Sequence, residues 1–121
     1  MSEPYDSEIR KIVKKIAKKN KINIKEGVYV QTPGPTFETV AEIKMLGKMG
    51  VDAVAMSLGI EVIAARQANI KVCGISMITN KATGLRRGKQ SDEEVRDTAS
   101  KNAKKLEKLL YAAIPEIAKV K

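Results

Sequence analysis

Residues 28–39, VYVQTPGPTFET, contain three kinds of local structure in succession. The first five positions are rich in β-branched and aromatic side chains and predict a strand. Residues 33–35, Pro-Gly-Pro, then predict a tight turn, because Gly34 tolerates positive φ and each proline fixes its own φ. Thr39, followed three residues later by Glu42, predicts a capping box that opens a helix. The stretch therefore indicates a strand, a turn and a helix start of the kind found in α/β proteins.

The turn also indicates where a binding site would lie. In α/β proteins, ligands usually bind at the edge of the sheet where the strands end. Phe37 and Glu38 follow the turn directly, so we expect an aromatic face and a carboxylate acceptor at that edge.

Hydrophobic spacing on both sides of this stretch predicts further elements in alternation. Helices are expected at residues 6–20, 39–49, 59–68 and 91–114, and strands at residues 28–32, 53–57 and 71–79. Ser91 and Glu94 predict a second capping box, and Pro115 is expected to kink or end the last helix. The side chains expected to face the core from the second helix are Ala41, Met45, Leu46 and Met49, and the third helix is expected to be largely buried.

Helices that alternate with strands imply parallel crossovers. The expected fold is a layered α/β sandwich with a small, mainly parallel sheet of about three strands and about four helices. Because a chain of 121 residues can bury one hydrophobic core, we expect a single α/β domain over residues 1–121.

Composition narrows the possible functions. No apolar run approaches the roughly 20 residues of a membrane span, and the first residues do not have the pattern of a signal peptide, so we expect a cytoplasmic protein that does not enter membranes. Cys73 is the single cysteine and there is no histidine. This excludes a disulfide within the chain and nucleophilic sites of the Ser-His or Cys-His kind. We also expect no metal and no cofactor.

Positive charge is the other feature of the composition. The chain has 23 Lys and Arg against 14 Asp and Glu, a formal charge of +9. Such a balance favours acidic partners, but three tyrosines and one phenylalanine leave few rings for base stacking. We interpret the lysines as solvated helix faces and do not expect nucleic acid as the partner. The alternative is a basic binding module that uses Arg86, Arg87, Lys89 and the first helix, whose affinity would fall steeply with salt.

Five segments together resemble the trimeric purine nucleoside phosphorylases. They are GVYV at 27–30, GPTFET at 34–39, GVDAVAMS at 50–57, EVIAAR at 61–66 and GISMITNK at 74–81. The resemblance extends over nearly the whole chain. The subunits of that family are longer, so this chain is expected to correspond to their carboxyl-terminal half, whether truncated, split or redesigned.

The resemblance implies phosphorolysis of inosine or guanosine to the free base and ribose 1-phosphate, with phosphate as co-substrate. It implies that Glu38 accepts hydrogen bonds from N1 and the 2-amino group of a 6-oxopurine. Asn80 would bond the N7/O6 edge as negative charge develops on the leaving base. The other substrate-binding residues implied are Phe37 and Thr79 at the base, Met56 at the sugar and Ser57 at the phosphate.

Other positions depart from the family pattern. Its main phosphate-binding serine, histidine and arginine and its glycine-rich loop belong to the half that this sequence does not resemble. Ala55 and Leu58 replace a glycine and a threonine of the family motif. We therefore expect the chain by itself to release no hypoxanthine from inosine and phosphate. The expected partners are a purine base or nucleoside and either a complementary amino-terminal half or further copies of the chain. The alternative is a truncated or engineered stand-alone α/β domain without catalytic function.

Overall fold

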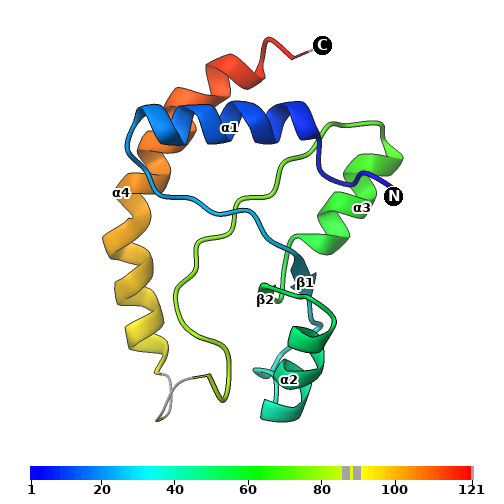
Figure 1. Ribbon diagram of the computed structural model, residues 1–121, viewed down its shortest axis with the longest axis vertical. Helices are drawn as coiled ribbons and strands as arrows, with labels where there is room; N and C mark the ends of the chain where they lie inside the picture. Colours follow the sequence, from blue (N-terminus) through cyan, green and yellow to red (C-terminus); the bar gives the residue numbers. More distant parts are fainter. Residues whose placement is uncertain (86–87, 89–90, 121) are drawn as a thin grey trace.

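The computed structural model describes residues 1–85, 88 and 91–120, and these residues form an open frame of helices around a small sheet (Figure 1). The α/β class is confirmed. In chain order the described elements are α1 (Ser7–Lys19), β1 (Tyr29–Gln31), α2 (Val40–Lys48), β2 (Ala53–Ala55), α3 (Gly59–Gln67) and α4 (Asp92–Ile117).

The sheet in the described residues has two parallel strands, β1 and β2. The prediction of a third strand at residues 71–79 is wrong. That segment has the side chains of a strand, but Cys73 to Thr79 make no backbone-to-backbone hydrogen bond with any described residue. A strand is defined by the ladder that it forms with a neighbour, so β propensity without a neighbour gives only an irregular segment.

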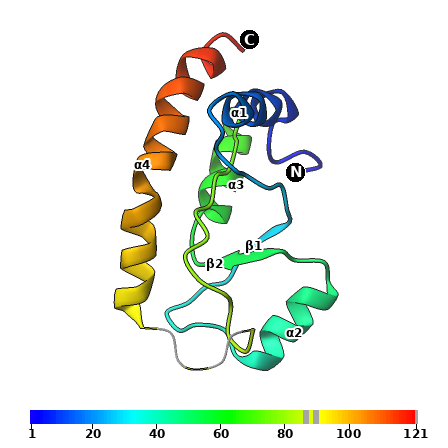
Figure 2. The same ribbon diagram turned by 60° about the vertical axis from the view of Figure 1, so that its left-hand side comes forward.

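The hydrophobic core lies between α1 and α4. Figure 1 shows α1 crossing the carboxyl-terminal half of α4, and Figure 2 shows α1 nearly end-on beside it. The buried residues that form this contact are Ile9, Val13, Ile16 and Ala17 of α1 and Leu109 and Ala113 of α4. The amphipathic pattern predicted for residues 6–20 is therefore confirmed. The Asp6 carboxylate caps α1 by accepting hydrogen bonds from the Glu8 and Ile9 backbone N–H groups, both at 2.9 Å. The bond from Ile9 is the main reason that the pKa of Asp6 is lowered.

The burial predicted for α2 and α3 is wrong. Met45 of α2 and Met49, which directly follows it, are 54% and 71% exposed; Leu46 is half-buried, and the buried residue of α2 is Ile43. In α3, Ile60 and Ile63 are exposed and Val62 is buried. The physical reason is the size of the sheet, because two strands of three residues cannot cover the apolar face of a helix.

The last helix starts as predicted and ends later. The Ser91 and Glu94 capping box is present, but α4 continues past Pro115 to Ile117. A proline so near a helix end removes little of the remaining hydrogen bonding, so the helix is not forced to stop there. Leu109 is the leucine of α4 that is fully buried, whereas Leu110 is 37% exposed. Neither α4 nor any other helix of the described residues combines the length and the hydropathy needed to cross a membrane.

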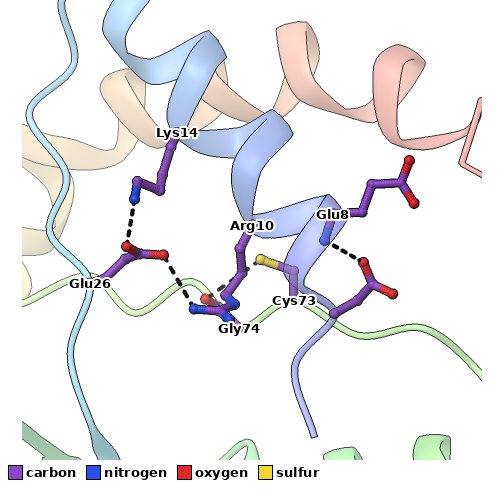
Figure 3. A network of polar contacts seen from close by, with 7 residues as sticks. Glu8, Arg10, Lys14, Glu26, Cys73 and Gly74 are labelled. Atoms are coloured by element: carbon purple, nitrogen blue, oxygen red, sulfur yellow. Dashed lines mark hydrogen bonds and ion pairs between the residues drawn. The ribbon is translucent and has the colours of Figure 1, made fainter. Parts of the chain in front are cut away.

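An exposed ion-pair network connects α1 to the segment that leads into β1 (Figure 3). Glu26 accepts a hydrogen bond of 2.6 Å from Lys14 Nζ and one of 3.3 Å from Arg10 Nη1. Both cations lie on α1, so this carboxylate fixes the approach of the chain to the sheet.

Acid is expected to weaken this connection. The hydrogen bond from Lys14, together with the charges of Lys14 and Arg10, lowers the pKa of Glu26 below its ordinary value of 4.5. A carboxyl group whose folded pKa is lowered adds stability above the unfolded pKa, and that stability is lost as the pH falls through the folded pKa. The melting temperature should therefore fall as the pH is lowered below about 4.5, and less steeply in Glu26→Gln. Thermal unfolding followed by circular dichroism would measure the dependence of melting temperature on pH for both proteins.

The matched control is Glu107→Gln, which removes an exposed carboxylate on α4 that lies outside this network. Its melting temperature should depend on pH as that of the unmodified protein does. An equal dependence on pH for Glu26→Gln and the unmodified protein would contradict the role of the network.

Candidate functional site

The two strands end at the same edge of the sheet. They are parallel, with Tyr29 opposite Ala53 and Gln31 opposite Ala55. The next backbone N–H, that of Thr32, donates to the Ala55 carbonyl at 2.9 Å and extends the pairing by one residue. Residues that follow the strands are therefore brought to one edge, which we call the strand-end site (residues 32–38 and 56–57).

The turn after β1 lies directly against Met56. Gly34 has a φ of +68°, and a Cβ atom at this position would be 2.6 Å from the Met56 sulfur. Only glycine combines that backbone conformation with such a close approach. The Met56 side chain is 46% exposed, so its remaining surface is available to a ligand.

Glu38 is held at the entrance of this site. Thr32 Oγ1 donates to Glu38 Oε1 at 2.5 Å, across the turn, and the carboxylate is half-buried. Thr39, the next residue, caps α2 in the predicted capping box. The Thr39 N–H donates to Glu42 Oε2 at 2.6 Å, and this backbone bond is the main reason that the pKa of Glu42 is lowered. The start of α2 is thus fixed, and Glu38 is fixed with it.

Phe37 and Ser57 complete the strand-end site. The Phe37 ring is 58% exposed. The Ser57 side chain is exposed, and its backbone carbonyl accepts a hydrogen bond from the Tyr29 hydroxyl group. Phe37, Glu38, Met56 and Ser57 therefore all belong to the two segments that follow the strands.

Gln31, the last residue of β1, supports the strand-end site and was not predicted from the sequence. Its Oε1 accepts from the Gly59 N–H at 2.5 Å and the Ile60 N–H at 3.1 Å, so it caps α3. Its Nε2 group lies 3.4 Å from the Met56 carbonyl, to which it donates. The sequence did contain a signal for this role. Gln31 is a polar residue at the end of a strand, and from there its side chain can reach the start of the helix that follows the neighbouring parallel strand.

Thr79 and Asn80 line a different hollow. The Thr79 hydroxyl donates to Asn80 Oδ1 at 2.6 Å, and Asn80 Nδ2 donates to the Lys81 carbonyl at 3.1 Å. The hollow has a volume of about 440 Å³. Its lining comprises residues 79–81 and, from α4, Glu94, Asp97, Thr98 and Lys101, and it includes none of Phe37, Glu38, Met56 and Ser57.

The loop after Asn80 reaches the start of α2. A Cβ atom on Gly84 would lie 3.0 Å from the methyl groups of Val40, the first residue of α2. The structure therefore brings Gly84, four positions after Asn80, to the start of α2, whereas Asn80 itself lines the hollow beside α4.

Two further inferences from the sequence stay predictions. Among the described residues, no group of three or more His, Cys, Asp or Glu side chains could hold a metal ion. Arg86, Arg87 and Lys89, the basic residues of the alternative nucleic-acid module, lie outside the described residues.

Comparison with known proteins gives one consistent answer. The family model described as the phosphorylase superfamily matches residues 1–115. Purine nucleoside phosphorylase 1 of Geobacillus stearothermophilus is 40% identical over 119 residues, which are 98% of this chain and 43% of that protein. The purine nucleoside phosphorylase of Bos taurus is 42% identical over 122 residues, covering 95% of this chain and 42% of that protein.

Solved structures agree with the sequence relatives. The Schistosoma mansoni purine nucleoside phosphorylase in complex with inosine superposes with a TM-score of 0.87 at 35% identity, covering 93% of this chain and 41% of that one. The Schistosoma mansoni methylthioadenosine phosphorylase, at 24% identity and a TM-score of 0.91, supports the fold alone. The chain spans less than half the length of the two curated relatives from Geobacillus stearothermophilus and Bos taurus.

Proposed function

This chain belongs to the phosphorylase superfamily, and we propose that it is the purine-base-binding half of a purine nucleoside phosphorylase. The reaction would be cleavage of the N-glycosidic bond of inosine or guanosine by phosphate, giving the base and ribose 1-phosphate. Phosphate would be a co-substrate, and no cofactor would be needed. We place the protein in the cytoplasm, where nucleosides are salvaged.

The observation that carries this proposal is the arrangement of Glu38. Thr32 Oγ1 donates a hydrogen bond to Glu38 Oε1, and Glu38 Oε2 makes no hydrogen bond with any described residue. Among the described residues one carboxylate oxygen is therefore available to donors of a ligand, and Phe37 and Met56 of the same strand-end site have exposed apolar surface. A flat ring with N–H groups on one edge suits such a site, because its faces contact apolar groups and its edge meets an acceptor.

The charge on Glu38 discriminates between purines. A 6-oxopurine has a hydrogen on N1 and donates to a carboxylate, whereas N1 of adenine has a lone pair and would face the same charge unfavourably. A bond between a charged acceptor and a donor is worth about 1.5–3 kcal/mol. We therefore propose hypoxanthine and guanine, rather than adenine, as the bases bound.

Asn80 would act on the leaving base if it were brought from the separate hollow that it lines in this structure to the base at the strand-end site. Its Nδ2 group has two N–H donors, and the Lys81 carbonyl accepts from one of them. The second N–H is available to donate to N7 or O6 as negative charge develops on the purine. Stabilisation of developing charge by a positioned donor is commonly the largest part of such catalysis. Thr79 would orient this amide, because its hydroxyl donates to Oδ1.

Titration of the ¹⁵N-labelled chain with hypoxanthine tests the proposal. We expect shifts in the amide signals of residues 32–38 and 56–57. Glu38→Gln should weaken binding by roughly 10- to 100-fold, because it replaces a charged acceptor by a neutral amide. Adenine should bind more weakly than hypoxanthine.

The control is again Glu107→Gln, which removes a carboxylate from α4 outside the strand-end site and should leave the affinity unchanged. Binding is the appropriate readout, because we expect no release of hypoxanthine from inosine and phosphate by this chain alone. Equal affinities of Glu38→Gln and the unmodified chain for hypoxanthine, or no binding by either, would refute the assignment.

A further inference from the structure

Leu58, in the turn between β2 and α3, has a backbone conformation that its side chain disfavours. Its φ is +86° and its ψ is −40°. Glycine adopts positive φ readily, but a bulky residue does so at a cost in free energy, and such a conformation persists only where the surroundings enforce it. Leu58 also makes no side-chain hydrogen bond that would cap α3. A group from outside the turn must therefore hold this backbone.

Gln31 of β1 is the group that holds it. Its Oε1 accepts from the Gly59 N–H at 2.5 Å and from the Ile60 N–H at 3.1 Å, directly after Leu58. Its Nε2 donates to the Met56 carbonyl at 3.4 Å, two residues before Leu58. One side-chain amide therefore bridges the turn, and the residue in the disfavoured conformation lies between its points of attachment.

The fit between Gln31 and the turn is close. A Cβ atom on Gly59 would be 2.7 Å from Gln31 Oε1 and 3.2 Å from Gln31 Cβ, so a larger residue there would displace the amide. Tyr29 lies two positions before Gln31, hence on the same face of β1, and its hydroxyl donates to the Ser57 carbonyl. Two side chains of one strand face thus hold the turn on both sides of Leu58.

This turn carries the second segment of the strand-end site, residues 56–57. The carbonyls of both residues are bonded to β1 side chains, whereas their own side chains are exposed, that of Met56 by 46%. Glu38 belongs to the other segment and is held by Thr32. Removal of the Gln31 amide should therefore loosen residues 56–57 and leave the carboxylate of Glu38 in place.

We propose that Gln31 is a positioning residue that fixes residues 56–57 to receive the ribose of a nucleoside. The inference rests on the proposed function, in which the base meets Glu38. A nucleoside is larger than its base, and when its base is held by one edge at the first segment, the second segment remains for the sugar. Gln31 acts through the turn that it holds, and so it sets the affinity for a nucleoside relative to that for the free base.

Titrations of the ¹⁵N-labelled full chain with inosine and with hypoxanthine test this role. Gln31→Met keeps the length of the side chain and removes its hydrogen bonds. It should weaken inosine binding by about tenfold and change hypoxanthine binding by less than about twofold. The Gly59 and Ile60 amides should also exchange faster with solvent. A residue that served only stability would alter the affinity for both compounds equally.

Two further variants separate positioning from folding. Gln31→Glu keeps an oxygen that accepts from the N–H groups at the start of α3, so its affinity for inosine should stay within about threefold of that of the unmodified chain. When Gln31→Met is combined with Leu58→Gly, glycine adopts the positive φ without support, so the affinity for inosine should return to within about threefold.

The matched control is Gln67→Met, the same substitution at an exposed residue of α3. It should leave both affinities unchanged. Circular dichroism would verify that each variant retains its helices.

Two results would overturn the inference while the proposed function stands. The first is hypoxanthine binding that depends on Glu38, together with inosine binding that Gln31→Met leaves unchanged or weakens only as much as hypoxanthine binding. The second is unchanged exchange of the Gly59 and Ile60 amides in Gln31→Met, a measurement that needs no ligand. If the unmodified chain bound neither compound, the proposed function would fail, and the role of Gln31 toward ribose would fail with it.

Discussion

Leu109→Ala should lower the free energy of unfolding by about 2–5 kcal/mol, because it leaves a cavity in the only extended core of the described residues. Leu109 is 2% exposed and lies on α4 where α1 crosses it. Eight apolar residues are buried among the described residues, so few other contacts can compensate. Since whole domains are stable by about 5–15 kcal/mol, this single change should remove a large share of the total.

Urea unfolding followed by circular dichroism would measure the loss, with Leu110→Ala as the matched control. Leu110 is the next residue of the same helix and is 37% exposed, so its truncation should cost about 1 kcal/mol or less. If both variants lost the same free energy, the packing of α1 on α4 would not be the main source of stability.

Gly34→Ala should disrupt the strand-end site. Alanine at a φ of +68° costs about 1–2 kcal/mol, and its Cβ would stand 2.6 Å from the Met56 sulfur. The Met56 side chain must move away, and with it one of the apolar surfaces of the strand-end site. We expect a loss of stability of about 1–3 kcal/mol and a weaker affinity for hypoxanthine.

Gly47→Ala is the control, and its effect should have the opposite sign. Gly47 lies within α2, and a Cβ atom there would meet nothing within 4 Å. Alanine in place of a helical glycine should stabilise the protein by about 0.5–1 kcal/mol. Denaturant unfolding and hypoxanthine titration of both variants give the comparison. A Gly34→Ala protein that matched the unmodified one in both measurements would show that the close approach to Met56 is not required.

Local sequence signals predicted the elements well. Asp6, Thr39 and Ser91 cap their helices because a side-chain oxygen is within reach of an N–H group two or three residues away. The turn at Gly34 follows from the same kind of reasoning, since positive φ is a property of the residue itself. The resemblance to purine nucleoside phosphorylases came from five short segments and is confirmed by the family comparison.

Predictions that depended on distant neighbours were wrong. The apolar pattern of α2 and α3 indicated burial, and residues 71–79 indicated a strand, but the described residues supply neither a wide sheet nor a pairing edge for them. Gln31 was overlooked for a related reason. Its role as a cap for α3 depends on the parallel pairing that brings the Gly59 N–H within 2.5 Å of its side chain, across 28 positions of sequence.

The sequence by itself determined the helix starts, the Pro-Gly-Pro turn, the α/β class and the family, because each depends on neighbouring residues or on a pattern that the chain carries intact. Only the tertiary structure decided which apolar faces are covered, that Thr32 holds Glu38, and that residues 73–79 have no backbone partner among the described residues. Burial and strand pairing are interactions between segments far apart in sequence. They form only where another surface is present, so a chain can have every local property of a strand and still lack the sheet that would make it one.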